Sequence, residues 1–211
     1  MAEEGGLILT LGSWVLVEAC RQGAYWNKGR QGIPLTVTIN LSGKQLLHDG
    51  LMDEISVALR ASELPPEYLI LEITETVLMH ETETTLRRLG ELKALGVRLA
   101  IDDFGTGYSS LSYLQQFPVD VLKIDQSFIE GLLRGTSDSA LVSAIIALAG
   151  SLSLRTIAEG VEDPGQREKL RTLGCDAAQG FLFSRPVPAE DVDVLLSSGP
   201  NETRPEALIS Q

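Results

Sequence analysis

The chain has 211 residues, of which 44% are hydrophobic, and a formal net charge of −12. This size and composition allow one large folded domain and exclude a wholly disordered chain. The negative charge disfavours binding to nucleic-acid polymers and anionic membranes, but it permits a small anionic ligand where metal ions neutralise the site.

Cysteine usage and the chain's apolar segments indicate its compartment. Cys20 and Cys175 lie far apart and neither belongs to a CxxC pair, so we expect neither a disulfide framework nor a cysteine zinc site. The segment 1–4 is acidic where a signal peptide would be basic, and the longest uncharged run, 139–154, is too short to span a bilayer. These features predict a cytoplasmic protein without a membrane segment.

Short apolar runs alternate with longer segments of helical periodicity along the chain. In chain order we expect a helix at 7–24, a strand at 35–40, a helix at 51–59, a strand at 68–73, a helix at 81–95, a strand at 97–101, a helix at 110–115, a strand at 121–124, a helix at 140–152, a strand at 155–158, a helix at 164–173, a strand within 177–183 and a helix at 189–196. Residues 1–196 then form one domain, and 197–211, rich in Ser, Gly, Pro and charge, form a flexible tail.

Two helices carry specific expectations about burial. The apolar spacing of the first makes Trp14, Val15, Leu16 and Val17 candidates for its buried face. The helix at 140–152 is apolar throughout, so we expect it to be buried on most sides.

The alternation of strands and helices predicts an α/β fold with a parallel sheet. Polar residues recur where the strands end, which is typical of a (β/α) barrel whose strand ends converge on one mouth. They are Asn40, Glu72, Asp102, Asp103, Lys123, Asp125, Glu159 and Gln179. A closed barrel of this type has eight strands, so we expect a TIM-like barrel with about six of its eight strands in this chain.

The polar strand ends predict a site for a hard divalent cation. Asn40, Glu72, Asp102 and Asp103 supply oxygen ligands, which Mg²⁺ and Mn²⁺ prefer, whereas only two histidines occur in the chain. Lys123 can hold a phosphate oxygen or orient a water, and Glu159 can act as a general base or as a further ligand. This set suits hydrolysis of a phosphodiester by two metal ions.

Several of the candidate residues also have an interpretation without function. Asp102 or Asp103 can cap the next helix, as can Asp125, and Asn40 can end a strand in a turn. Glu75 and Glu162 can be acids on the surface or behind the site, and Gln179 can be a buried hydrogen-bonding residue. Phe104 and Tyr108 can simply belong to the core.

Six segments, taken together and in order, resemble motifs of the EAL-domain family of bacterial cyclic-di-GMP phosphodiesterases. They are Asn40-Leu41-Ser42, Glu72-Ile73-Thr74-Glu75, the run Asp102-Asp103-Phe104-Gly105-Thr106-Gly107-Tyr108-Ser109-Ser110, Leu122-Lys123-Ile124-Asp125, Ala158-Glu159-Gly160-Val161-Glu162 and Gln179-Gly180-Phe181. The resemblance extends over nearly the whole chain, from about residue 3 to residue 194.

The resemblance implies roles for these residues in opening cyclic-di-GMP to linear pGpG with Mg²⁺ or Mn²⁺. Asn40, Glu72 and Asp102 would bind one metal ion, and Asp102 and Asp103 would bind a second. Lys123 and Glu159 would contact the attacking water or the second metal ion. Glu75 would anchor the loop that begins at Phe104. The remaining positions implied to bind substrate or shape this loop are Gly105, Thr106, Gly107, Tyr108, Ser109, Asp125, Glu162 and Gln179.

The chain departs from the family at its start, because the Glu-Ala-Leu strand is absent. The missing segment would carry two strands and one metal-binding glutamate, so we expect an N-terminally incomplete barrel with impaired activity. The resemblance also implies a homodimer and a longer multidomain signalling protein. Two other hypotheses stay open: a catalytically silent module that binds cyclic-di-GMP or a protein partner through 113–121, and an unrelated metal-dependent phosphatase.

Overall fold

The computed structural model describes residues 6–78, 82–106 and 114–197. The chain forms two compact units, Met1–Ile101 with Gly107–Val119 and Asp102–Thr106 with Asp120–Gln211. The strand β3 (Arg98–Phe104) has residues in both units, because the boundary lies between Ile101 and Asp102. Part of the predicted helix at 110–115 lies outside the described residues, as does the tail from residue 198 onward.

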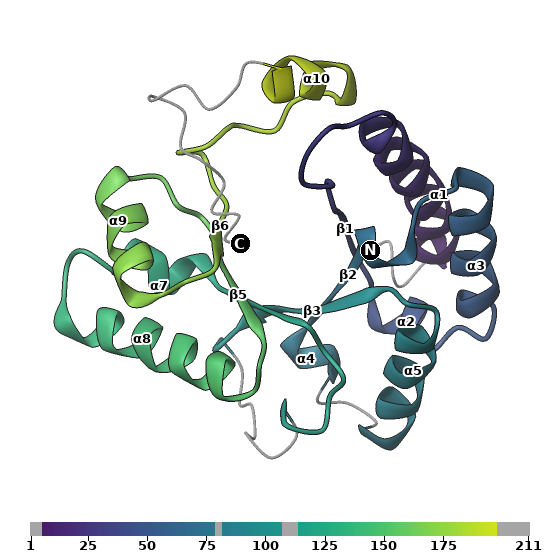
Figure 1. The fold of residues 1–211 in the computed structure, drawn as a ribbon. Coiled ribbons are helices and arrows are strands. Elements are labelled where there is room, and N and C mark those ends of the chain that lie inside the picture. The colour runs from purple at the N-terminus through teal and green to yellow at the C-terminus, as the bar shows by residue number, and fades with distance from the viewer. Residues whose placement is uncertain (1–5, 79–81, 107–113, 198–211) are drawn as a thin grey trace. The chain divides into compact units, whose positions relative to one another are not determined.

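The first unit alternates strands and helices as expected. Its elements are α1 (Leu7–Asn27), β1 (Val37–Asn40), α2 (Gly43–Leu46), α3 (Leu51–Ser62), the 3-10 helix η1 (Pro66–Tyr68), β2 (Leu69–Thr74), α4 (Glu75–Leu78), α5 (Thr82–Ala94) and the first half of β3. The helices α1 and α3 lie side by side next to β1 (Figure 1). Strand β1 begins two residues later than predicted, because the backbone of Leu35 is hydrogen-bonded to the Asn27 side chain instead.

A glycine brings α1 close to the sheet. A Cβ atom at Gly23 would lie 2.9 Å from Cγ1 of Val37, so no larger residue fits at this crossing. The buried face of α1 was predicted only in part: Leu16 is buried, whereas Trp14 is 64% exposed and Val17 is 51% exposed. The prediction was wrong for Trp14 and Val17 because α1 is apolar around most of its circumference, so its hydrophobic spacing does not single out one face.

The second unit contains the remaining strands. It comprises the second half of β3, β4 (Val121–Ile124), α7 (Gln126–Glu130), α8 (Thr136–Ser151), β5 (Arg155–Ala158), α9 (Pro164–Leu173), β6 (Ala177–Ala178) and α10 (Ala189–Ser197). All four residues of β4 are buried, as expected for an inner strand of a parallel sheet. Figure 1 shows α7, α8 and α9 on one side of β5.

The helix α8 is less buried than predicted. Among its side chains that the structure describes, only Val142, Ile145 and Ala149 are buried, and Leu141 is 43% exposed. The prediction was wrong because Ala and Ser, which fill most of the exposed face, carry no charge and so resemble core residues in the sequence.

The strands of the first unit lie in the order β1-β2-β3, and those of the second in the order β3-β4-β5-β6. Pairing is parallel for β1 with β2, β4 with β5 and β5 with β6. Strands that follow one another in chain order and alternate with helices are the arrangement of a (β/α) barrel, and the described residues contain six such strands, which confirms the predicted fold class.

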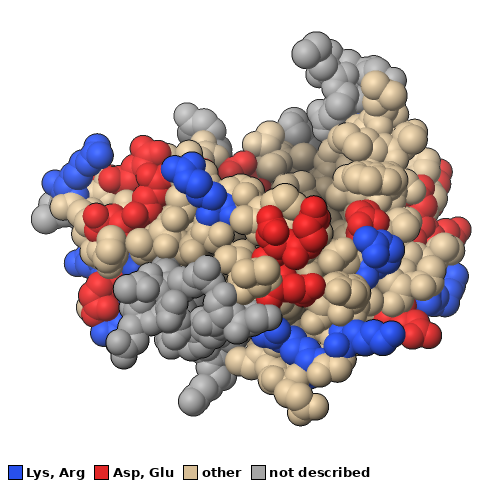
Figure 2. Space-filling model, turned by 90° about the horizontal axis from the view of Figure 1, so that it is seen from above, with Lys and Arg blue, Asp and Glu red and all other residues tan. Residues whose placement is uncertain are grey.

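The surface carries both acidic and basic side chains (Figure 2). On the face shown in Figure 2, Asp and Glu side chains gather near the centre, with Lys and Arg side chains lying among and around them. Within the described parts of the chain, no helix is both long enough and apolar enough to cross a membrane. Cys20 and Cys175 are free thiols, and both are buried.

The helix α9 has a complete set of end signals. The Asp163 carboxylate accepts a hydrogen bond from Gly165 N at 2.6 Å, Pro164 is the first helical residue, and Gly174 ends the helix at a φ of 83°. We expect Asp163→Ala to lower the free energy of unfolding by about 1 kcal/mol, measured by urea denaturation. Glu168→Ala, which removes only an exposed ion pair with Arg171, is the control and should change it by about 0.5 kcal/mol or less. Equal effects of both variants would contradict the capping role.

Candidate metal and phosphodiester site

Two acids at the end of β3 form the centre of the site. Asp102 and Asp103 follow the buried run from Leu99 to Ile101. Asp103 has a positive φ of 54°, which few residues other than Gly, Asn and Asp adopt. The Thr106 side chain and backbone N–H both donate to the Asp103 carbonyl oxygen, at 2.9 and 3.4 Å, and close the turn that holds this conformation.

Lys123 joins the acids of two strands. Its side chain, only 4% exposed, extends from β4, and its Nζ donates to Oδ1 of Asp102 at 2.8 Å and lies 2.5 Å from Oε1 of Glu159. Glu159 follows β5 directly, and its side chain is 16% exposed. An ammonium this deeply buried needs such partners, because an unpaired buried charge is costly.

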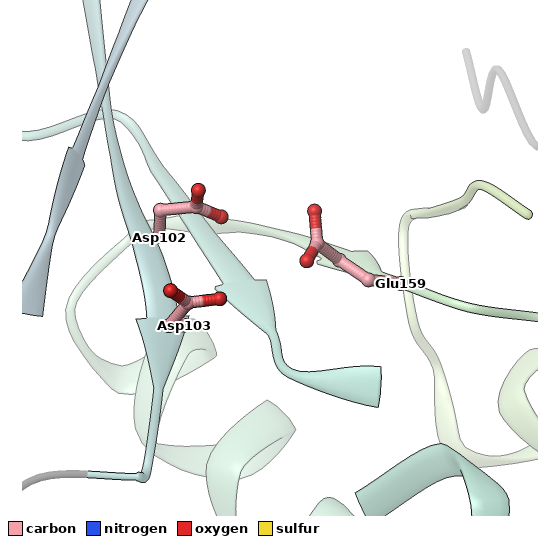
Figure 3. A group of neighbouring side chains, drawn as sticks. All are labelled: Asp102, Asp103 and Glu159. Carbon is pink, nitrogen blue, oxygen red and sulfur yellow. The ribbon is translucent and has the colours of Figure 1, made fainter. Parts of the chain in front are cut away.

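The three carboxylates form one cluster. Figure 3 shows the side chains of Asp102 and Asp103 projecting from β3 towards that of Glu159, and their ligand oxygens all lie within 4.8 Å of one another. Three oxygen donors at this spacing fit a hard divalent cation such as Mg²⁺ or Mn²⁺. The residues therefore form a candidate metal centre, and Lys123 supplies the positive charge beside it.

Burial and mutual repulsion make two of these acids weaker. Burial raises the pKa of Glu159, and the nearby charges of Asp102 and Asp103 raise it further, while Lys123 acts in the opposite direction. Burial likewise raises the pKa of Asp103, with Asp102 and Asp125 adding repulsion. Carboxylates that hold protons more tightly than usual gain from a bound cation, which relieves the repulsion among them.

A cavity of about 410 Å³ opens beside Glu159. Its wall includes Glu162, Gln179 and Phe181, and Arg185 lies over the Phe181 ring with its guanidinium carbon 4.6 Å from the ring centroid. Gln179 Nε2 donates to Oε1 of Glu159 at 2.6 Å and so connects the cavity wall with the acidic cluster. An aromatic face, a cation and several hydrogen-bonding groups beside a metal centre suit a ligand that has both rings and phosphates.

The cavity wall depends on a glycine. At Gly180, with a φ of 152°, a Cβ atom would lie 2.3 Å from the backbone N and O of Val161. We expect Gly180→Ala to force these two loops apart and to lower the free energy of unfolding by about 1–3 kcal/mol, measured by urea denaturation. Gly150→Ala in α8 is the matched control: apart from the adjacent backbone of its own helix, no atom lies within 4 Å of the new methyl group, so stability should rise by up to about 1 kcal/mol. If Gly180→Ala were as stable as the native chain, this crowding would not exist.

The structure brings several predicted residues together and leaves others untested. Asp102, Asp103, Lys123, Glu159 and Gln179 are linked within the second unit, and Glu162 lines the cavity beside them. Asn40, the last residue of β1, is the register partner of Glu72, which lies two residues before the end of β2 in the first unit. Their role as ligands of the same metal ion stays a prediction.

The structure places the other predicted residues that it describes outside the acidic cluster, each in a different environment. The Asp125 carboxylate caps α7 by accepting a hydrogen bond from Ser127 N at 3.0 Å. Phe104 is buried, and a Cβ atom at Gly105 would lie 2.8 Å from the Phe128 ring. Glu75 is buried at the start of α4 in the first unit, so its role in anchoring the loop stays a prediction. Gly107, Tyr108 and Ser109 lie outside the described residues.

Sequence reasoning did not identify Gln126, Phe181 and Arg185 as site residues, although all three line the cavity. Arg185 follows the last strand by several residues, so the position of the strand ends gave no reason to select it. The Gln-Gly-Phe run was recognised as a motif, but a Phe suits a core position as well as a cavity wall, so the sequence did not single out Phe181.

Comparison with known proteins agrees with this geometry. The bifunctional diguanylate cyclase/cyclic di-GMP phosphodiesterase MucR of Pseudomonas aeruginosa is 48% identical over 192 residues, which are 91% of this chain and 28% of MucR. The cyclic di-GMP phosphodiesterase NbdA of the same organism is 43% identical over 197 residues, which are 93% of this chain and 25% of NbdA. The chain therefore spans about a quarter of the length of these relatives.

Solved structures show the same fold. The phosphodiesterase PaMucR in complex with c-di-GMP matches with a TM-score of 0.86 and 48% identity, covering 90% of this chain and 77% of that one. The EAL domain of Mycobacterium smegmatis DcpA matches with a TM-score of 0.84 and 43% identity, covering 90% of this chain and 85% of that one. The family model described as the EAL domain matches residues 1–186. The chain thus belongs to the EAL domain family.

Proposed function

We propose that this chain is a phosphodiesterase domain that hydrolyses cyclic-di-GMP to linear pGpG with Mg²⁺ or Mn²⁺. The observation that carries the proposal is the cluster of Asp102, Asp103 and Glu159, whose ligand oxygens lie within 4.8 Å of one another beside the buried Lys123. Relatives named as cyclic di-GMP phosphodiesterases, and a solved relative in complex with c-di-GMP, support the choice of substrate.

Each residue of the cluster has a proposed task. Asp102, Asp103 and Glu159 would hold the divalent ions, and the family resemblance adds Asn40 and Glu72 as further ligands. Bound ions supply a Lewis acid that lowers the pKa of water and offsets the charge of the phosphate. Lys123 would orient the attacking water or a phosphate oxygen, and Glu159, whose pKa is raised, would accept the proton from that water.

The reaction opens one phosphodiester bond of the ring. The water oxygen forms a new bond to phosphorus, the bond from phosphorus to a ribose 3′ oxygen breaks, and that oxygen leaves as a hydroxyl group after taking up a proton. The cavity beside Glu159, with Phe181, Arg185 and Gln179 in its wall, would bind a guanine base and adjacent polar groups of the ligand. We also propose that the domain acts in the cytoplasm, as a homodimer, within a longer signalling protein.

The test is hydrolysis of cyclic-di-GMP by this chain in the presence of Mg²⁺ or Mn²⁺, with pGpG separated by chromatography. Formation of pGpG that stops when EDTA is added would support the proposal. Asp191→Asn, which removes one exposed charge from α10, is the control and should leave the rate unchanged. Binding of cyclic-di-GMP without any pGpG would instead favour a silent binding module, and absence of both would refute the choice of ligand.

A further inference from the structure

The side chains of the last strand, β6, do little to fix the register in which it pairs with β5. β6 consists only of Ala177 and Ala178, which pair with Ile157 and Ala158 of β5, and it stands at the end of the strand order. Alanine has a very small side chain, and a shift of one residue would still leave an alanine at one of the two paired places. Side-chain packing within β6 therefore specifies the register weakly, which is the situation in which strands slip.

A polar pair precedes these two alanines and a second one follows them. Before the ladder, Asp176 Oδ2 accepts hydrogen bonds from Thr156 N at 2.7 Å and from Thr156 Oγ1 at 2.9 Å. Asp176 N donates back to Thr156 Oγ1 at 3.1 Å. After the ladder, Gln179 Nε2 donates to Oε1 of Glu159 at 2.6 Å. Thr156 and Glu159 are three residues apart on one side, as are Asp176 and Gln179 on the other.

We propose that Asp176 is a positioning residue for the metal centre: with Thr156 it fixes the register of β6 and thereby holds Gln179 against Glu159. The proposal rests on the proposed function, since it matters for activity only if Glu159 serves the metal site. Thr156 is 1% exposed, so its polar groups need partners, and the Asp176 carboxylate supplies one that no alanine of β6 can offer.

We call the hydrogen bonds between Asp176 and Thr156 the clamp. The consequence of losing this clamp follows from the residues that neighbour Gln179 in the sequence. A slip by one residue would bring Ala178 or Gly180 to the place opposite Glu159, and neither has a side chain that can donate a hydrogen bond. The ladder hydrogen bond from Gln179 N to Ala158 O, at 2.8 Å, would have to break as well. Oε1 of Glu159 would then keep Lys123 but lose the amide that orients it from the other side.

A double-mutant cycle tests whether Asp176 and Gln179 act on the metal site through the same hydrogen bond, with Mg²⁺ affinity measured by titration. We expect Gln179→Ala and Asp176→Ala each to weaken Mg²⁺ binding about tenfold, the range typical for residues that orient a metal ligand. The double variant should be no weaker than either single one, because both changes remove the same hydrogen bond to Glu159. Additive losses, about a hundredfold together, would overturn the proposal and leave Asp176 a merely structural residue.

Conservative variants distinguish the hydrogen bonds of Asp176 from its negative charge. They also keep the test valid if Asp176→Ala fails to fold. Both hydrogen bonds from Thr156 reach the same oxygen of Asp176, so Asp176→Asn can keep them and should retain native Mg²⁺ affinity. Thr156→Val keeps the shape of the side chain but loses the hydroxyl, and we expect an affinity between those of Asp176→Asn and Asp176→Ala. Equal loss in Asp176→Asn and Asp176→Ala would show that charge matters and would refute the clamp.

A second measurement does not depend on the metal. In an NMR spectrum of the metal-free chain, the side-chain amide of Gln179 should shift in Asp176→Ala towards its position in Glu159→Ala. An unchanged resonance would refute the clamp. If the native chain itself bound no Mg²⁺, the proposed metal chemistry would fail, while the amide resonance would still decide whether Asp176 sets the position of Gln179. Asp191→Ala in α10 is the control and should leave the resonance in place.

Discussion

Asp102→Asn should lower the rate of pGpG formation from cyclic-di-GMP by about a thousandfold or more, given that even residues outside the ligand shell cost ten- to hundredfold. The Asp102 carboxylate lies within 4.8 Å of those of Asp103 and Glu159 and also accepts a hydrogen bond from Lys123. An amide keeps the shape and one accepting oxygen but removes the charge that two metal ions would share. The loss should therefore appear in metal affinity and in rate together, while the fold is retained.

Titration with Mg²⁺ and chromatography of the product measure the two effects, and circular dichroism verifies the fold. Asp191→Asn is the matched control, because it makes the same chemical change at an exposed position of α10. Native turnover in Asp102→Asn would refute the shared-ligand role. Normal Mg²⁺ affinity with lost turnover would move Asp102 from metal binding to the chemical step.

The order and type of the main elements could be predicted because their signals are local. The strands at 121–124 and 155–158 and the helix at 164–173 have the predicted bounds. For α9 the reason is explicit, since Asp163, Pro164 and Gly174 mark its two ends. The short helices α2, α4 and α7 were not predicted, because four or five residues are too few to show a helical period.

The acidic centre could be predicted because the carboxyl ends of parallel strands meet at one edge. That rule selected Asp102, Asp103, Lys123 and Glu159, and the structure links all four. It also placed Asp125 in the set, and the Asp125 carboxylate caps α7. An acid directly after a strand suits a helix cap as well as a site residue, so the role of Asp125 in the site stays a prediction.

Hydrogen bonds between residues far apart in the sequence could not be predicted. Thr156 and Asp176 are twenty residues apart and become partners only through the register of β5 and β6. Gln166 is a similar case: its Nε2 donates to the carbonyl oxygen of Ile129 at 2.9 Å, and its Oε1 accepts from the backbone of Glu162 at 2.9 Å. Its place three residues after Asp163 is a local capping signal, but its contact with Ile129, 37 residues away in the chain, has no local signal.

Lys123→Met is expected to separate binding of the metal from the chemical step. The variant removes the ammonium that now pairs with Oδ1 of Asp102 and Oε1 of Glu159, and it keeps most of the buried volume. If Lys123 orients the attacking water or phosphate, the rate of hydrolysis should fall by about a hundredfold or more. Mg²⁺ affinity at high pH should instead rise, because a cation no longer competes for these oxygens.

The pH dependence of Mg²⁺ binding gives the second signature of this variant. Lys123 holds down the pKa values of Glu159 and Asp103, which burial raises, so its removal should raise both further. Because a carboxylate must lose its proton to bind the ion, the pH at which Mg²⁺ binding is half-maximal should move upward in Lys123→Met. Lys169→Met, which changes a lysine of α9, should show neither effect. Loss of Mg²⁺ binding at every pH would mean that the lysine assembles the carboxylates, and a normal rate would exclude it from the chemical step.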